Sequence, residues 1–258
     1  MSTNHRDDPS GAKTNREGWK ALYLVGGIAA LLASSVFRRN WGVEMMTFSG
    51  FGLFDVPEAW PVSALDWFEL LQVDRYVGLS LLGLYDLINY ALVGLIFMAL
   101  YGALRGANQG ARLAALASGL VGATIFISSN PAIDMLSLSD RYAAAPIGER
   151  SLVLAVGEAL LAHHNPVGPY HGTGYYFGLF LVLVAGLIFS IVMLRGAVFN
   201  KWTAIAGILA NSIYLLFFPV LAIVPSINWI PPSFAAPFRL IWYILIMIQL
   251  FKLSRRDG

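Results

Sequence analysis

The feature that most restricts the fold of this chain is a series of apolar stretches, each about as long as a bilayer is thick. Residues 175–194 and 202–224 contain no charged side chain at all. A helix rises about 1.5 Å per residue, so roughly 20 apolar residues cross a hydrocarbon layer of about 30 Å. Charged residues make up 12% of the sequence, against about 25% in soluble domains. The sequence therefore predicts a membrane protein with several spans.

The stretches predict an all-α fold, a polytopic transmembrane bundle of six spans. These spans cover residues 21–37, 76–104, 113–127, 175–194, 202–224 and about 234–251. We expect a polar tail over residues 1–20, one membrane domain over residues 21–254, and a short polar end at residues 255–258. The extracytoplasmic segments are then residues 38–75 and 130–173.

Each of these outer segments is predicted to contain an amphipathic helix. In the first, Ser63 and Asp66 have the spacing of a capping box, and apolar residues follow at helical intervals. In the second, the apolar part of residues 148–164 is too short to span a bilayer and contains Glu158. We also expect residues 226–238 to form an uncharged outer loop at headgroup depth.

Basic residues predict the orientation of the spans. The two short loops that contain Arg105 with Arg112, and Arg195 with Lys201, carry basic residues and no acid. Loops of this kind are typical of the cytoplasmic side. Both termini are therefore predicted to be cytoplasmic.

Small residues at intervals of four predict where the helices touch. Gly119 and Gly122 belong to two such rows in the third span, and Gly174, Gly178 and Gly186 lie along the fourth. Small side chains let helix backbones approach closely in lipid. We expect these rows to pack the bundle of a single chain rather than a homodimer.

Asp86 and Asn89 are the candidate ligand-binding or proton-binding residues. Asp86 is the one acid well inside the predicted second span, and Asn89 follows three residues later. An aspartate at bilayer depth costs about 2.5–3.5 kcal/mol on insertion scales, so it needs a partner. The alternative is a structural aspartate that is hydrogen-bonded to a neighbouring helix.

Three histidines form the second candidate cluster. His163, His164 and His171 lie close together, and Glu158 precedes them. Imidazole and carboxylate groups suit zinc, copper or iron, but this spacing matches no established site. Adjacent histidines on a helix also point about 100° apart. The prediction is that no metal is bound, with a site at these four residues as the alternative.

Several classes of protein are excluded by what the sequence lacks. There is no cysteine, so thiolate metal sites and iron–sulfur clusters are excluded. No P-loop, HExxH or GxSxG pattern occurs, and no lysine lies mid-span to hold retinal. A net charge of +2 gives no indication of a nucleic-acid partner. We predict no cofactor, and expect bound lipid.

Four strings between Leu136 and Asn211 carry a resemblance to a known family. They are SLSDRYAAA, GEALLA, GTGYYFG and LRGAVFNKWTAIAGILAN. With them, the chain resembles an uncharacterised family of six-span prokaryotic membrane proteins, domain of unknown function 4386. The resemblance implies a six-helix bundle in a bacterial inner or archaeal plasma membrane, and it brings no site residues.

Three functions stay open from the sequence. The first is a non-catalytic accessory or structural subunit that binds other membrane proteins, as the lack of catalytic motifs indicates. The second is a carrier or binding protein for a small or lipid-like molecule that uses Asp86 and Asn89. The third is a membrane metalloenzyme that uses the histidine cluster.

Overall fold

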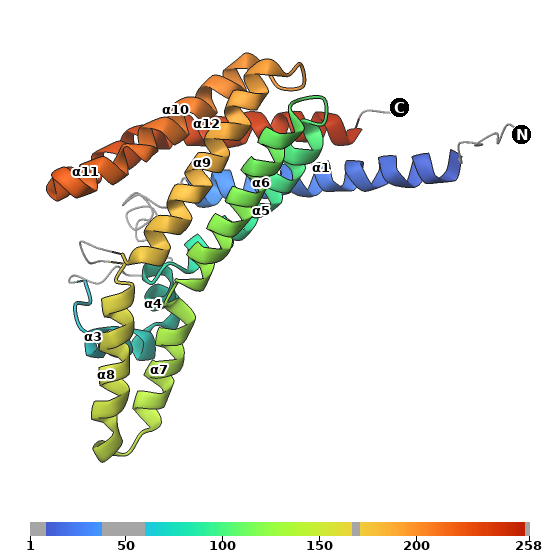
Figure 1. The fold of residues 1–258 in the computed structure, drawn as a ribbon. Coiled ribbons are helices and arrows are strands. Elements are labelled where there is room, and N and C mark those ends of the chain that lie inside the picture. Colours follow the sequence, from blue (N-terminus) through green and yellow to red (C-terminus); the bar gives the residue numbers. More distant parts are fainter. Residues whose placement is uncertain (1–8, 38–59, 167–170, 256–258) are drawn as a thin grey trace, which may run out of the picture.

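The computed structural model describes residues 9–37, 60–166 and 171–255, and side chains of the first helix between residues 17 and 34. Within these ranges the chain forms helices and no strand. Figure 1 shows a group of long helices from which a helical hairpin extends. The helices are α1 (Pro9–Phe37), α3 (Ala64–Val73), α4 (Arg75–Leu81), α5 (Leu84–Ala103), α6 (Gln109–Ser128), α7 (Ala132–Ala144), α8 (Ile147–His163), α9 (Thr173–Arg195), α10 (Lys201–Leu215), α11 (Phe217–Ile223), the 3-10 turn η1 (Pro225–Ile227) and α12 (Ile230–Arg255).

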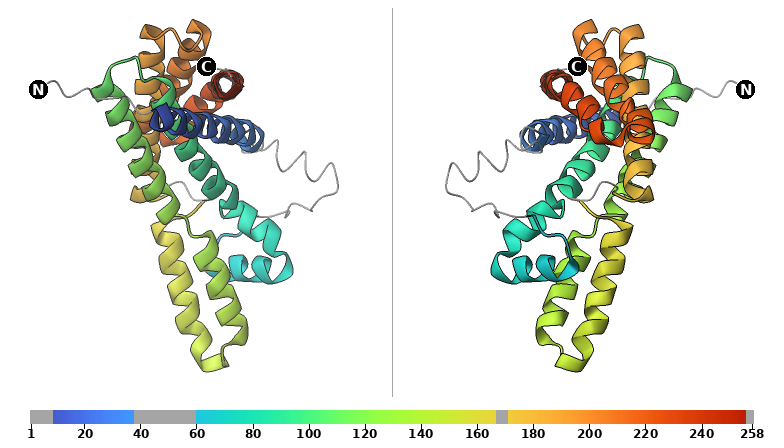
Figure 2. Two further views of the ribbon diagram at one scale, coloured as in Figure 1. Left: turned by 90° about the vertical axis from the view of Figure 1, so that its right-hand side faces the viewer. Right: turned by 90° about the vertical axis from the view of Figure 1, so that its left-hand side faces the viewer.

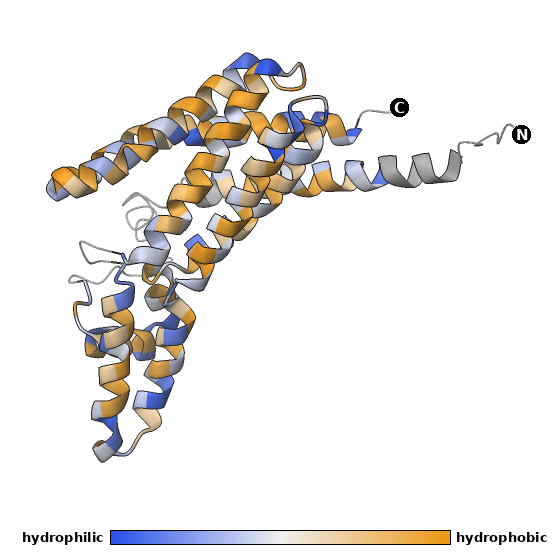
Figure 3. Cartoon of the chain, viewed as in Figure 1, coloured by the Kyte–Doolittle hydropathy of each residue, from blue (hydrophilic) through white to orange (hydrophobic). Residues whose placement is uncertain are grey.

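Five helical stretches in the described residues are long and apolar enough to cross a membrane. They are Leu84–Ala103, Gln109–Ala144, Thr173–Arg195, Lys201–Ile223 and Pro225–Arg255. Figure 3 shows apolar residues along most of these helices and hydrophilic residues gathered at the loops and on the hairpin. The predicted multi-pass helical character is therefore confirmed, with five candidate spans among the described residues. The predicted first span, residues 21–37, lies within α1 and stays a prediction.

The predicted second span is wrong in one respect, because residues 76–104 do not form one continuous helix. The chain breaks between α4 and α5 at Gly83, whose φ of 92° lies in the left-handed region. Glycine adopts this conformation without the steric cost that other residues meet. The break places Asp86 in the first turn of α5 rather than in the middle of a span.

Asn130 holds this break in place. Its side-chain Nδ2 donates to the Gly83 carbonyl at 3.1 Å, and its Oδ1 accepts from the Ala132 amide at 2.9 Å. The same side chain therefore fixes the start of α5 and the start of α7.

Helices α6 and α9 pack together through glycines, as predicted for a single chain. A Cβ atom on Gly122 would lie 2.7 Å from the Gly178 carbonyl oxygen, and one on Gly178 would lie 2.7 Å from the Gly122 carbonyl oxygen. A Cβ atom on Gly186 would instead lie 2.6 Å from the side-chain Oδ1 atom of Asn211 on α10. The backbones touch because no side chain separates them.

The hairpin of α7 and α8 extends from α6 and α9, and α3 and α4 lie beside it (Figure 2). These four helices share a hydrophobic core of their own, which includes the buried side chains of Trp67, Phe68, Leu71 and Met135. The α3 cap is the predicted capping box of Ser63 and Asp66. The backbone amides of Ser63 and Val62 donate hydrogen bonds to the Asp66 carboxyl and lower its pKa, and a hydrogen bond with the Ser63 side chain lowers it as well.

The last two spans also differ in detail from the sequence prediction. The helix over residues 202–224 is interrupted at Leu216, between α10 and α11, near Pro219, which cannot donate a bond to the Leu215 carbonyl. The predicted outer loop at residues 226–238 is mostly helical, since α12 already begins at Ile230.

Candidate functional site

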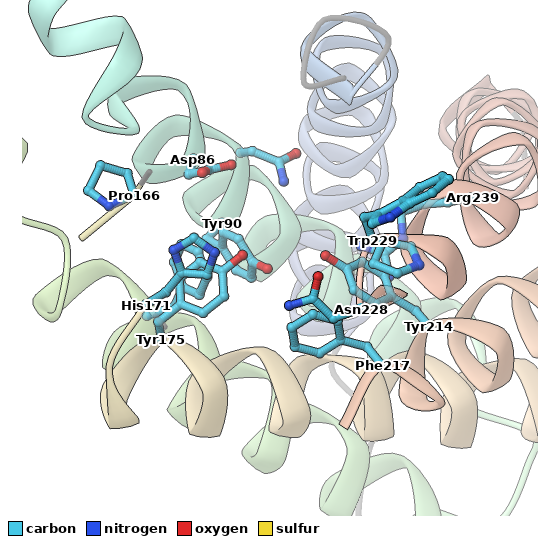
Figure 4. Close-up of a pocket in the computed structure, with 13 residues that line it drawn as sticks. Asp86, Tyr90, Pro166, His171, Tyr175, Tyr214, Phe217, Asn228, Trp229 and Arg239 are labelled. Carbon is cyan, nitrogen blue, oxygen red and sulfur yellow. The ribbon is translucent and has the colours of Figure 1, made fainter. Parts of the chain in front are cut away.

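A cavity of about 320 Å³ lies where α5, α6, α9, α10, α11 and α12 meet. Figure 4 shows its lining residues, which come from these helices and from the segments that join them. The residues are Asp86, Asn89, Tyr90, Phe126, Pro166, His171, Tyr175, Tyr214, Phe217, Asn228, Trp229, Pro232 and Arg239. The volume is near the lower end of the roughly 300–1,000 Å³ range of small-molecule sites.

The first two turns of α5 supply an acid and an amide. Asp86 lies in the first turn, where the positive end of the helix dipole stabilises a carboxylate. Asn89 lies one turn later and is 6% exposed, and its buried Oδ1 has no hydrogen-bond partner among the described residues. The Gly83 break is what brings both candidate residues to the cavity wall.

Arg239 on α12 supplies the opposite charge. Its side chain is 7% exposed, and its guanidinium carbon lies 4.7 Å from the centre of the Tyr214 ring. The face of an aromatic ring stabilises a nearby guanidinium group, and the guanidinium offers hydrogen-bond donors only. In Figure 4, Asp86 and Arg239 lie at different sides of the cavity.

Aromatic rings form most of the wall between these charges. Tyr90 stacks on Phe126 with ring centres 3.7 Å apart, and Tyr175 lies 4.8 Å from Phe126. His171 lies 4.8 Å from Tyr175, and its Nδ1 is 2.8 Å from the Asn165 carbonyl oxygen. Burial lowers the pKa of His171, so its neutral form is favoured. The cavity thus combines an aromatic surface with a few polar groups.

The alternative metal site does not assemble in the part of the chain that the structure describes. No group of three or more His, Asp or Glu side chains there is placed to hold an ion. His163 is exposed, whereas the ring centres of His164 and His171 are 6.4 Å apart. The Glu158 Oε1 atom accepts a hydrogen bond from the Ala64 amide at 2.7 Å. Glu158 therefore joins α8 to the start of α3.

Sequence reasoning found the α5 side of the cavity but missed the α12 side. Asp86 and Asn89 stand out in the sequence because they are polar within an apolar stretch. Arg239 carries the same signal, a lone charge among apolar residues, but it lies near the start of the predicted last span, where a charge is common. Tyr214 and Trp229 carry no local signal.

A family model described as a domain of unknown function (DUF4386) matches residues 73–252, more than half of the chain. The chain belongs to the DUF4386 family. The resemblance seen in the sequence is thereby confirmed, and the matched residues include every residue that lines the cavity. No curated protein and no solved structure matches the chain.

Proposed function

We propose that this DUF4386 protein is a multi-pass membrane protein that binds a small molecule in the cavity between α5, α9, α10 and α12. The observation that carries the proposal is the Asn89 carboxamide, whose Oδ1 is buried and without a partner in the described residues. Such an atom costs about 1–3 kcal/mol, and a ligand that donates a hydrogen bond to it recovers that cost.

The surroundings of Asn89 support the same function. Buried polar groups at one end and aromatic rings along the walls are the usual composition of small-molecule sites. The hypotheses of an accessory subunit and of a metalloenzyme receive no support from a comparable feature of the described residues. Binding is therefore the function that the geometry supports best.

Co-purified molecules test this proposal. Asn228→Trp places a large ring in the cavity wall, whereas Ser226→Trp adds the same ring at an exposed position of η1 that does not line the cavity. Organic extracts of the wild type and the two variants, purified in parallel, are compared by mass spectrometry. We expect a molecule that is retained by the wild type and by Ser226→Trp and lost from Asn228→Trp. Identical extracts from both variants would contradict the proposal.

A further inference from the structure

Two charges of opposite sign border the cavity. Asp86 comes from the start of α5 and Arg239 from α12. Tyr90 and Tyr175 line the same cavity as the two charged residues. Figure 4 shows the tyrosine rings in the space between them. A ligand that fills the cavity therefore meets a cationic group and an anionic group.

The hydrogen-bonding groups divide in the same way. The Arg239 guanidinium offers only donors, whereas an ionised Asp86 and the Oδ1 atom of Asn89 offer only acceptors. A matching molecule has acceptors at the end that faces α12 and donors at the end that faces α5. A carboxylate and an ammonium group meet these two requirements.

Charge balance favours a ligand that carries both groups. A ligand with one charge adds a net charge to a site between membrane helices, where an unpaired charge is costly. A molecule with one positive and one negative group adds none. The aromatic rings of Tyr90 and Tyr175 also attract an ammonium group. The α5 side of the cavity therefore favours a cation through both its acceptors and its aromatic rings.

We propose that the cavity binds a small zwitterion of the amino-acid class, with its carboxylate on Arg239 and its ammonium group between Asp86 and Asn89. This inference rests on the proposed binding function and names the ligand class. The cavity volume of about 320 Å³ limits the ligand to a single small molecule.

A matched set of probes tests the assignment. L-Phenylalanine carries both groups, 3-phenylpropanoate carries only the carboxylate, and 2-phenylethylamine carries only the amine. γ-Aminobutyrate is a second zwitterion, with its charges further apart. Dissociation constants are measured by isothermal titration calorimetry on the protein in lipid nanodiscs. We expect at least one zwitterion to bind more than about tenfold more tightly than either singly charged probe.

Two variants assign the ends of the ligand. Arg239→Gln is expected to weaken L-phenylalanine and 3-phenylpropanoate at least about tenfold and to leave 2-phenylethylamine unchanged. Asp86→Asn is expected to weaken L-phenylalanine and 2-phenylethylamine and to leave 3-phenylpropanoate unchanged. The unaffected probe shows that each variant is folded. If Arg239→Gln binds no probe, Arg239→Lys, which keeps the charge, is expected to retain the order of affinities.

The outcomes separate the ligand class from the binding function. Equal affinities for zwitterions and singly charged probes, or no binding of either zwitterion, overturn the assignment. The proposed function has its own test in the extracts of Asn228→Trp and Ser226→Trp. Loss of a molecule from Asn228→Trp alone, together with failed zwitterion binding, would keep the function and reject the ligand class.

Discussion

His164 lies at the end of α8 with 4% of its surface exposed, and its Nδ1 has no partner among the described residues. Desolvation, together with the nearby His171 and His163, lowers the pKa of His164 from 6.5 to about 4. A hydrogen bond with the Ser129 backbone opposes this shift. The folded protein therefore holds His164 neutral at pH values where the unfolded chain is protonated.

This residue makes the stability of the fold dependent on pH. Since the unfolded chain binds one more proton between pH 6.5 and about 4, the His164 contribution is complete above pH 6.5 and is lost as the pH falls toward 4. The expected loss is roughly 2–3 kcal/mol. In detergent, the thermal unfolding midpoint of His164→Gln should depend less on pH across this interval than the midpoint of the wild type. The exposed neighbour gives the control, His163→Gln, and equal slopes in the two variants would refute the assignment.

At the scale of helices, the contact of α6 with α9 depends on the lack of side chains. A Cβ on Gly178 would meet the Gly122 carbonyl oxygen at 2.7 Å and the Phe126 amide nitrogen at 2.8 Å. Both are backbone atoms, so neither can rotate away. We expect Gly178→Ala to lower the free energy of unfolding by about 1–3 kcal/mol, as in other overpacked contacts.

The matched control for this change is Gly148→Ala at the start of α8. A Cβ there has nothing within 4 Å, and alanine has the higher helix propensity. Thermal unfolding in detergent should show a lower midpoint for Gly178→Ala and an unchanged or raised one for Gly148→Ala. Equal midpoints for the two variants would contradict the close contact between the backbones of α6 and α9.

The individual helices could be predicted from sequence because their signals are local. Apolar runs located α6 and α9, the pair Ser63 and Asp66 located the start of α3, and glycine spacing located a helix contact. The break at Gly83 could not be predicted, since many glycines lie within membrane helices. Its left-handed conformation is stabilised by Asn130, 47 residues further along the chain.

At the scale of the whole molecule, the α5–α6 loop and the α7–α8 turn lie at opposite ends of the structure (Figure 1). The first loop contains Arg105, and basic residues predict that it is cytoplasmic. The native chain has no cysteine, and neither Gly106 nor Gly148 has an atom within 4 Å of an added Cβ. These glycines are suitable positions for single cysteines.

Labelling of the two cysteines tests the orientation. Gly148→Cys should react with an impermeant maleimide in intact cells, and Gly106→Cys should react only after the membrane is permeabilised. Immunoblots that show comparable amounts of both variants provide the control. The reverse pattern of labelling would invert the predicted topology.

The cavity itself could be predicted only in part, because it forms between helices far apart in the sequence. Asp86 and Asn89 are visible as polar residues in an apolar run, and the structure adds Arg239 about 150 residues later. Which helix faces which is determined by the packing of α1, α5, α10 and α12. No periodicity within one helix specifies that arrangement.

Asn130 connects the beginning of α5 to the beginning of α7. Its single carboxamide closes one bond to the Gly83 carbonyl and another to the Ala132 amide. The beginning of α5 and the beginning of α7 therefore both depend on the position of this one side chain. One amide group thus connects the base of the hairpin to the helix that carries Asp86 and Asn89, and we expect the two helix starts to open together rather than independently.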